Sequence, residues 1–348
     1  MAYPLESRVC DRRYYTPFMA LVDRRIVIAA LGIVSLAIRL RAGGASAGQA
    51  GVGVQPPAAR DAEARAVTYL AVEVPRWRRE HPCYSCHNNG DAARALIAAT
   101  GRGYRIGDAL DDTLAFLATP ERWNANATRG GSEDLPLARI QFAGALTAMD
   151  GNGGAPAAEI DRAASHVAAH QQRDGSFRLS DTQTLGGSTF YGTALATALA
   201  RNILARATAG LVHQPLANAD AWLRRFEPES VLDASSILIG LGRATDAAAA
   251  AQRDRALAVL KRGQGSDGGW GPYVSSPSEP FDTALAVIGV SRVGDAALRP
   301  SIERARTYLV GAQNGDGSWP ETTRPPGGES YAQRISTTAW ALLALLES

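Results

Sequence analysis

The chain has 348 residues, with 36 Lys+Arg against 34 Asp+Glu and a net charge of +2. This balance argues against a nucleic-acid binder, because such proteins present a basic face. Aromatic residues make up 7% of the chain, which leaves little material for a cavity lined with aromatic rings.

The N-terminus has the features of an export segment. Ile26–Ile38 is an apolar run, Arg24 and Arg25 precede it, and Ala45-Ser46-Ala47 resembles a signal-peptidase site. The run is shorter than the roughly 20 residues that span a bilayer. We therefore expect residues 1–47 to be a signal peptide or export segment and 48–61 a linker. The protein would be periplasmic or otherwise exported, and it would touch a membrane only through an uncleaved N-terminal segment.

Cys83-Tyr84-Ser85-Cys86-His87 is a C-x-x-C-H motif, the spacing that attaches a c-type haem. The two thiols bond to the porphyrin and the adjacent imidazole binds the iron. Cys10 would leave with the export segment, so Cys83 and Cys86 would be the only thiols of the mature chain. The motif predicts haem c as the cofactor, with Cys83 and Cys86 as attachment points and His87 as the iron ligand.

The second axial ligand of such a haem stays open. The iron is five-coordinate, or its second ligand is one of the remaining histidines or a methionine, with the candidates being His81, His166, His170, His213 and Met149. The propionates would find partners in three arginines before the motif, Arg76, Arg78 and Arg79. Their alternative is an ordinary solvated helix face.

Two other chemistries fit the motif. His81, Cys83, Cys86 and His87 together have the ligand types of a zinc site. Cys83 and Cys86 alone have the spacing of a redox disulfide, although such motifs normally accompany a βαβ pattern, which this sequence lacks.

Beyond the motif the apolar periodicity is helical and comes in six pairs. The first helix of each pair is amphipathic and the second is small and apolar on nearly all sides, which is typical of a buried helix. The first helices are expected at 62–79, 108–119, 158–172, 217–226, 252–262 and 301–313. The second helices are expected at 90–101, 136–149, 190–206, 231–242, 282–293 and 335–347.

The turns between paired helices repeat. The three clearest copies run from a glutamine through a Gly/Asp turn to an aromatic residue, at 171–177, 264–270 and 313–319. Phe177 lies 93 residues before Trp270, and Trp270 lies 49 before Trp319. Both spacings fit a period of about 47 residues, as in helical repeat arrays. The glutamine is expected to bond backbone at a helix end, and the aromatic residue to wedge between repeats.

These Gln-…-Gly-x-Trp turns resemble the QW repeats of squalene and oxidosqualene cyclases and of the wider prenyltransferase α-toroid group. The inner helix starting Ser336-Thr337-Thr338-Ala339-Trp340 looks like the helix that follows such a turn. The good matches cover residues 160–348, and weaker similarity extends back to about 62. The resemblance implies an all-α (α/α)6 toroid over 62–348, with the C-x-x-C-H motif in the first hairpin turn.

The cyclase chemistry does not carry over with the fold. The family's Asp-x-Asp-Asp-Thr-Ala acid motif is matched by Glu279-Pro280-Phe281-Asp282-Thr283-Ala284, which places Phe281 where the central acid should stand. The family's zinc prenyltransferases need a cysteine at the cavity mouth, and no cysteine follows Cys86. Asp91, Asp233 and Asp282 lie at starts of inner helices, where they either cap the helix, which is the interpretation favoured here, or point into the mouth of the cavity.

The sequence thus predicts an exported toroid with one haem, working in periplasmic electron transfer or haem-dependent redox chemistry, with a redox partner protein. One alternative is a non-catalytic toroid that binds an apolar, terpenoid-like small molecule or a protein partner. A second alternative is a diverged terpene cyclase. The sequence assigns no catalytic residue.

Overall fold

The computed structural model describes residues 57–81, 83–124, 134–149, 154–179, 191–324 and 329–348. The predicted export segment 1–47 lies outside these residues. The predicted linker 48–61 lies partly inside the described residues. Its boundary is wrong there, because the first helix already begins at Pro57. Pro57–Ser348 forms one compact unit.

Within the described residues the chain consists of helices and contains no strand beyond a single bridge between Gln264 and Trp270. The first helices of the pairs are α1 (Pro57–Glu80), α3 (Asp111–Leu117), α6 (Ala157–Ala168), α8 (His213–Arg225), α10 (Ala247–Gly263) and α12 (Arg299–Gly311). The second helices are α2 (Ala93–Gly101), α5 (Leu135–Met149), α7 (Gly192–Leu204), α9 (Val231–Leu241), α11 (Pro280–Val293) and α13 (Tyr331–Glu347). The short elements are the π-helical turn η1 (His87–Ala92) and the 3-10 turns η2 (Pro120–Arg122), η4 (Gly210–Val212) and η5 (Ala296–Leu298).

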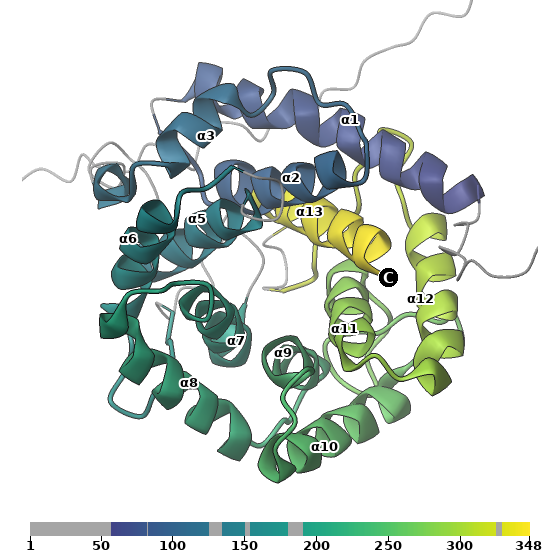
Figure 1. The fold of residues 1–348 in the computed structure, drawn as a ribbon. Coiled ribbons are helices and arrows are strands. Elements are labelled where there is room, and N and C mark those ends of the chain that lie inside the picture. The colour runs from purple at the N-terminus through teal and green to yellow at the C-terminus, as the bar shows by residue number, and fades with distance from the viewer. Residues whose placement is uncertain (1–56, 82, 125–133, 150–153, 180–190, 325–328) are drawn as a thin grey trace, which may run out of the picture. The chain divides into compact units, whose positions relative to one another are not determined.

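The six second helices form an inner ring and the six first helices surround them (Figure 1). Along α11 every residue from Pro280 to Val290 is buried, whereas α12 buries only Ala305, Arg306 and Leu309. The predicted all-α toroid is confirmed, as is the prediction that the helices apolar on all sides lie inside. No helix in the described part of the chain is both long and apolar enough to cross a membrane.

The glutamine of each repeated turn links two repeats. Its Nε2 donates to the carbonyl of the turn glycine four residues on and to a carbonyl near the start of the next outer helix. The sets are Gln171 with Gly175 and Pro215, Gln264 with Gly268 and Ser301, and Gln313 with Gly317 and Ala62, at 2.7–3.1 Å. The last set closes the ring, because Ala62 belongs to α1.

The aromatic residue after each turn is buried between layers, as expected. Trp319 donates from Nε1 to the Leu309 carbonyl at 2.7 Å, and its backbone N–H donates to Thr338 Oγ1 at 3.0 Å. Trp270 repeats both bonds with Leu260 and Thr283 at 2.8 Å. An indole can be fully buried here because its single polar hydrogen has a partner.

Gly317 should be irreplaceable at the ring closure. Its φ is +91°, and a Cβ built there would lie 2.5 Å from the Arg65 carbonyl oxygen of α1. We expect Gly317→Ala to lower the free energy of unfolding by about 2 kcal/mol or more, from positive-φ strain and the clash. Urea titration would measure this loss.

Gly315 provides the matched control, because it belongs to the same turn and a Cβ there would meet nothing within 4 Å. Gly315→Ala should change the free energy of unfolding by less than about 0.5 kcal/mol. Equal losses in the two variants would contradict the proposed role of the turn.

Candidate functional site

The C-x-x-C-H motif lies in the first hairpin turn, between α1 and η1, as predicted. Cys83, Cys86 and His87 are all buried. His87 opens η1, where the Asp91 N–H donates to the Cys86 carbonyl five residues back, at 3.1 Å. Such π-helical turns occur frequently at functional sites. All six residues of η1 are buried, so the motif stands at the start of the first inner helix.

Side chains from three directions hold this turn in place. Asn88 Nδ2 donates to the Glu73 carbonyl of α1 at 3.1 Å and to the Tyr331 hydroxyl of α13 at 2.9 Å. Asn89 Nδ2 donates to Thr113 Oγ1 of α3 at 2.8 Å. A Cβ at Gly90 would lie 2.7 Å from the Gln141 Cβ, so only glycine permits this approach to α5. The position of His87 is therefore fixed by its neighbours in η1.

The His87 ring is packed edge-on against two aromatic rings. Its centroid lies 4.9 Å from that of Trp77 and 6.0 Å from that of Tyr331. Among the described residues neither ring nitrogen has a hydrogen-bond partner. Burial, with a smaller contribution from His81, lowers the His87 pKa to about 3. The imidazole is thus neutral at ordinary pH, which is the form that binds a metal.

Four of the five candidate second axial ligands lie elsewhere in the ring, whereas His81 stacks on Trp77, whose ring also contacts His87. His170 contacts Arg139, and the His166 ring lies 6.3 Å from that of Trp123, in the second and third repeats. Met149 ends α5 and His213 begins α8. Because hairpin helices run antiparallel, both stand at the end of the ring opposite the motif. The ring contacts of His87 are instead with α1 and α13.

The other predicted partners of the motif also differ from expectation. Within the residues that the structure covers, no group of three or more His, Cys, Asp or Glu side chains is arranged to hold a metal ion, so the four-ligand zinc interpretation finds no support. His81 stacks on Trp77 at 3.8 Å. Arg76 pairs with Glu73 and Glu80, and Arg78 with Asp112, so Arg79 is the more available of the three proposed propionate partners.

Asp91 has an environment that the favoured capping interpretation did not predict. The Tyr191 hydroxyl donates to its carboxylate at 2.6 Å, Ser336 Oγ at 2.6 Å and Gln141 Nε2 at 2.7 Å. These donors come from the start of α7, from α13 and from α5. The capping interpretation is wrong for Asp91, because no side chain caps η1 or α2.

The other two inner-helix acids behave differently. Asp233 forms a capping box with Ser230 at the start of α9, as predicted. Asp282 is fully buried and pairs with Arg324 at 2.5 Å. Capping is therefore also wrong for Asp282, which neutralises an arginine instead.

The Asp91 network crosses the centre of the ring. Trp340 Nε1 of α13 donates to the Tyr191 hydroxyl at 2.9 Å. Their helices belong to the sixth and third hairpins, which face each other across a six-membered ring (Figure 1). The Phe281 ring stands 6.2 Å from that of Tyr191 and 6.4 Å from that of Trp340. At this level the centre is filled by one carboxylate and three aromatic rings.

Burial raises the Asp91 pKa to about 6, with hydrogen bonds and Arg94 opposing the shift. Burial raises the Asp282 pKa to about 7 in the same way, although Arg324 opposes it. Both carboxyls therefore exchange protons nearer neutrality than an exposed aspartate does.

Comparison with solved structures shows the same fold in other proteins. A protein from Actinoplanes matches with a TM-score of 0.57 and 17% identity, over 83% of this chain and 99% of that one. The type II terpene cyclase MstE from Scytonema matches in its apo form with a TM-score of 0.51 and 16% identity, over 83% of this chain and 98% of MstE. An MstE variant in complex with geranylgeranyl dihydroxybenzoate matches with a TM-score of 0.52 and 15% identity, over 83% and 97%.

At these identities the likeness is one of fold. It confirms the cyclase-like toroid that the QW-like turns predicted. A search against protein-family models found no match. A search of curated proteins also found none.

Asp91 should impose a pH dependence on stability. The pKa of Asp91 is higher in the folded state than in the unfolded chain, so the protonated carboxyl stabilises the fold. This stabilisation is fully present below about pH 4 and is lost as the pH rises through about 6. The loss amounts to up to about 3 kcal/mol of the free energy of unfolding. The Asp91→Asn variant lacks this titration. We therefore expect its free energy of unfolding, measured relative to that of the unmodified protein, to increase as the pH rises over that interval. Urea titrations at pH 4 to 7.5 would measure it.

The control is Asp254→Asn, which replaces an exposed carboxylate on α10. The difference in free energy of unfolding between this variant and the unmodified protein should not vary over the same pH interval. A pH-independent difference for Asp91→Asn would contradict the proton affinity assigned to Asp91.

Proposed function

We propose that this protein is an exported α-toroid that carries one covalent c-type haem on Cys83 and Cys86, with His87 as iron ligand. The observation that carries the proposal is the His87 imidazole, which is neutral, buried and without a hydrogen-bond partner among the described residues. A buried polar group normally has a partner, so a metal bond would explain this one.

The residues around the motif fit such a group. Both thiols and the imidazole arise within five residues, and η1 fixes the imidazole at the start of an inner helix. Trp77 and Tyr331 provide an apolar surrounding, which is one of the factors that tune a haem potential. When bound, the haem would supply a one-electron couple.

The placement of the other candidate ligands favours chemistry at iron over simple electron transfer. His166 and His170 lie beside Trp123 and Arg139, and Met149 and His213 stand at the other end of the ring. We propose an iron with a single protein ligand, leaving one position for a small molecule. The export features of residues 1–47 support a periplasmic location, where a redox partner protein would supply or remove electrons.

The test is the spectrum of protein produced with the haem-attachment machinery. A reduced-minus-oxidised spectrum should show an α band at the c-type position, and the denatured chain should retain the mass of haem. Cys83→Ala with Cys86→Ala should lose both signals, and His87→Ala should shift the band. Cys10→Ala is the control and should leave both signals unchanged.

Absence of the band from the unmodified protein, or its survival in the double variant, would overturn the haem proposal. N-terminal sequencing of exported protein separately tests cleavage after Ala47.

The Asp91 network favours a second candidate, a diverged terpene cyclase. A buried acid with a pKa near 6 faces Tyr191, Phe281 and Trp340, and aromatic faces stabilise cations. The solved structures of this fold include a cyclase bound to a terpenoid substrate.

Incubation with squalene and with geranylgeranyl dihydroxybenzoate, followed by product analysis, would test this candidate. Cyclised product that disappears in Asp91→Asn would support it. Binding of either compound without any product would instead favour the non-catalytic toroid that holds an apolar ligand.

A further inference from the structure

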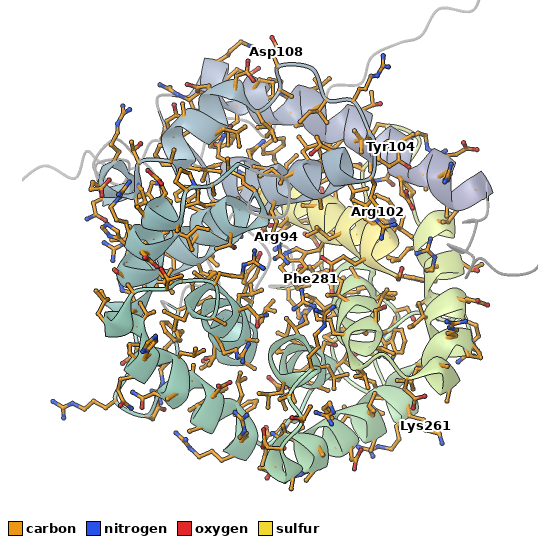
Figure 2. All side chains as sticks on the ribbon, in the orientation of Figure 1. Arg94, Arg102, Tyr104, Asp108, Lys261 and Phe281 are labelled. Atoms are coloured by element: carbon orange, nitrogen blue, oxygen red, sulfur yellow. The ribbon has the colours of Figure 1, made fainter. Side chains whose placement is uncertain are left out.

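Arg94 is set apart from the other arginines of the inner helices. It lies on α2, three residues after Asp91, and its side chain reaches the middle of the ring (Figure 2). The guanidinium carbon stands 4.9 Å from the centroid of the Trp340 ring. Arg94 forms no hydrogen bond or ion pair with any residue that the structure describes, and its ring contact with Trp340 leaves the N–H edge of the guanidinium available.

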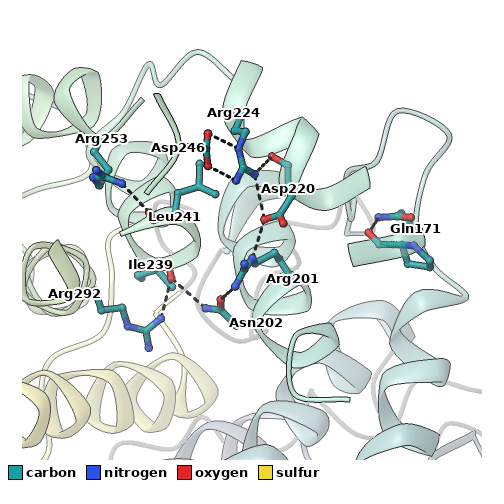
Figure 3. Close-up of polar contacts among 11 residues, drawn as sticks. Gln171, Arg201, Asn202, Asp220, Arg224, Ile239, Leu241, Asp246, Arg253 and Arg292 are labelled. Carbon is teal, nitrogen blue, oxygen red and sulfur yellow. Dashed lines mark hydrogen bonds and ion pairs between the residues drawn. The ribbon is translucent and has the colours of Figure 1, made fainter. Parts of the chain in front are cut away.

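Arginines on neighbouring elements do use their donors. Arg292 of α11 donates to the Ile239 carbonyl at 2.9 Å, and Arg201 of α7 donates to Asp220 at 2.9 Å (Figure 3). Arg306 of α12 donates to the Leu345 carbonyl at 2.8 Å. Arg292 and Arg306 thus satisfy carbonyls of inner helices and Arg201 pairs with a carboxylate, whereas Arg94 has neither kind of partner among the described residues.

Solvent reaches Arg94, although its neighbours Ala93 and Ala95–Ile97 on α2 are buried. On α2 the described residues are buried from Ala93 to Ala99 except Arg94 and Ala98, which are four apart and share a face. On α5, Gly144 and Ala148 are likewise partly exposed, and a Cβ at Gly144 would lie 4.0 Å from the Arg94 Cδ. The stem of Arg94 therefore lies against small, partly exposed residues of α5.

The electrostatic surroundings of Arg94 are positive. Burial lowers the Arg292 pKa and Glu347 opposes this, while Arg94 and Arg243 lower it further, so each of those two guanidinium groups repels Arg292. A carboxylate oxygen of Glu347 lies 3.7 Å from Arg292. Asp91 accepts its hydrogen bonds from Tyr191, Gln141 and Ser336, and Arg94 acts on it only through charge, which lowers the Asp91 pKa.

We infer that Arg94 binds an oxyanion, a carboxylate or phosphate group of a small molecule, in the ring centre, with Trp340 as its platform. A guanidinium stacked on an indole keeps its planar N–H edge free, and that edge matches both groups in a bidentate manner. The site is separate from the C-x-x-C-H motif and does not depend on a bound haem.

Isothermal titration calorimetry of the full chain with inorganic phosphate and with octanoate would test this, at constant ionic strength. Saturable binding of either probe is expected. Arg94→Gln should weaken it by about tenfold or more, because a charge-assisted bidentate contact is lost. Arg94→Lys should bind the probe with an affinity between those of the unmodified protein and Arg94→Gln, since lysine keeps the charge and lacks the planar guanidinium fork.

Arg262→Gln, on the exposed face of α10, is the control and should bind as the unmodified protein does. Arg292→Gln is a second variant, expected to weaken binding through lost positive charge. Circular dichroism would verify that each variant is folded. Binding of phosphate alone would identify a phosphate site, and binding of octanoate alone a carboxylate site. Absence of saturable binding of both probes, or undiminished binding to Arg94→Gln, would overturn the inference.

Discussion

One buried carboxylate, Asp91, joins the inner helices of this ring. Tyr191, Gln141 and Ser336 bring donors to it from the third, second and sixth hairpins, and Trp340 adds a bond to the Tyr191 hydroxyl. An unpaired carboxylate would be costly at this depth, so the network is favourable only when the ring is closed. The same bonds make the ring centre a packed polar junction at this level.

The turn that carries Asp91 also carries the C-x-x-C-H motif. His87 and Asp91 are the first and fifth residues of η1, and Asn88, Asn89 and Gly90 between them fix that turn to its neighbours. His87 and Asp91 therefore lie on one short buried turn whose side chains are held by neighbouring helices. The C-x-x-C-H motif and the carboxyl of the ring centre share that turn.

The sequence predicted what depends on local pattern. All six hairpins follow from the helical periodicity, and the bridging role of Gln313 follows from its place before a Gly/Asp turn. The helix start at Ala247 was missed because capping by Asp246 extends α10 beyond the apolar stripe. The partners of Asp91 could not be predicted, since Tyr191 and Ser336 lie 100 and 245 residues away and no local rule joins them. The π-helical turn likewise arises from tertiary contacts of η1.

Phe281 and the Asp91 network share the centre of the ring through Tyr191. In this chain Phe281 stands where the family's central acid would be, and its ring packs beside Tyr191 and Trp340. Two buried carboxyls stand at inner-helix starts, Asp91 on η1 and Asp282 on α11. Each is stable there only with a partner from another element: Tyr191 donates to Asp91 across the ring, and Arg324 pairs with Asp282. Asp91 lies four residues after His87, so the buried acid of the ring centre and the C-x-x-C-H motif share one segment.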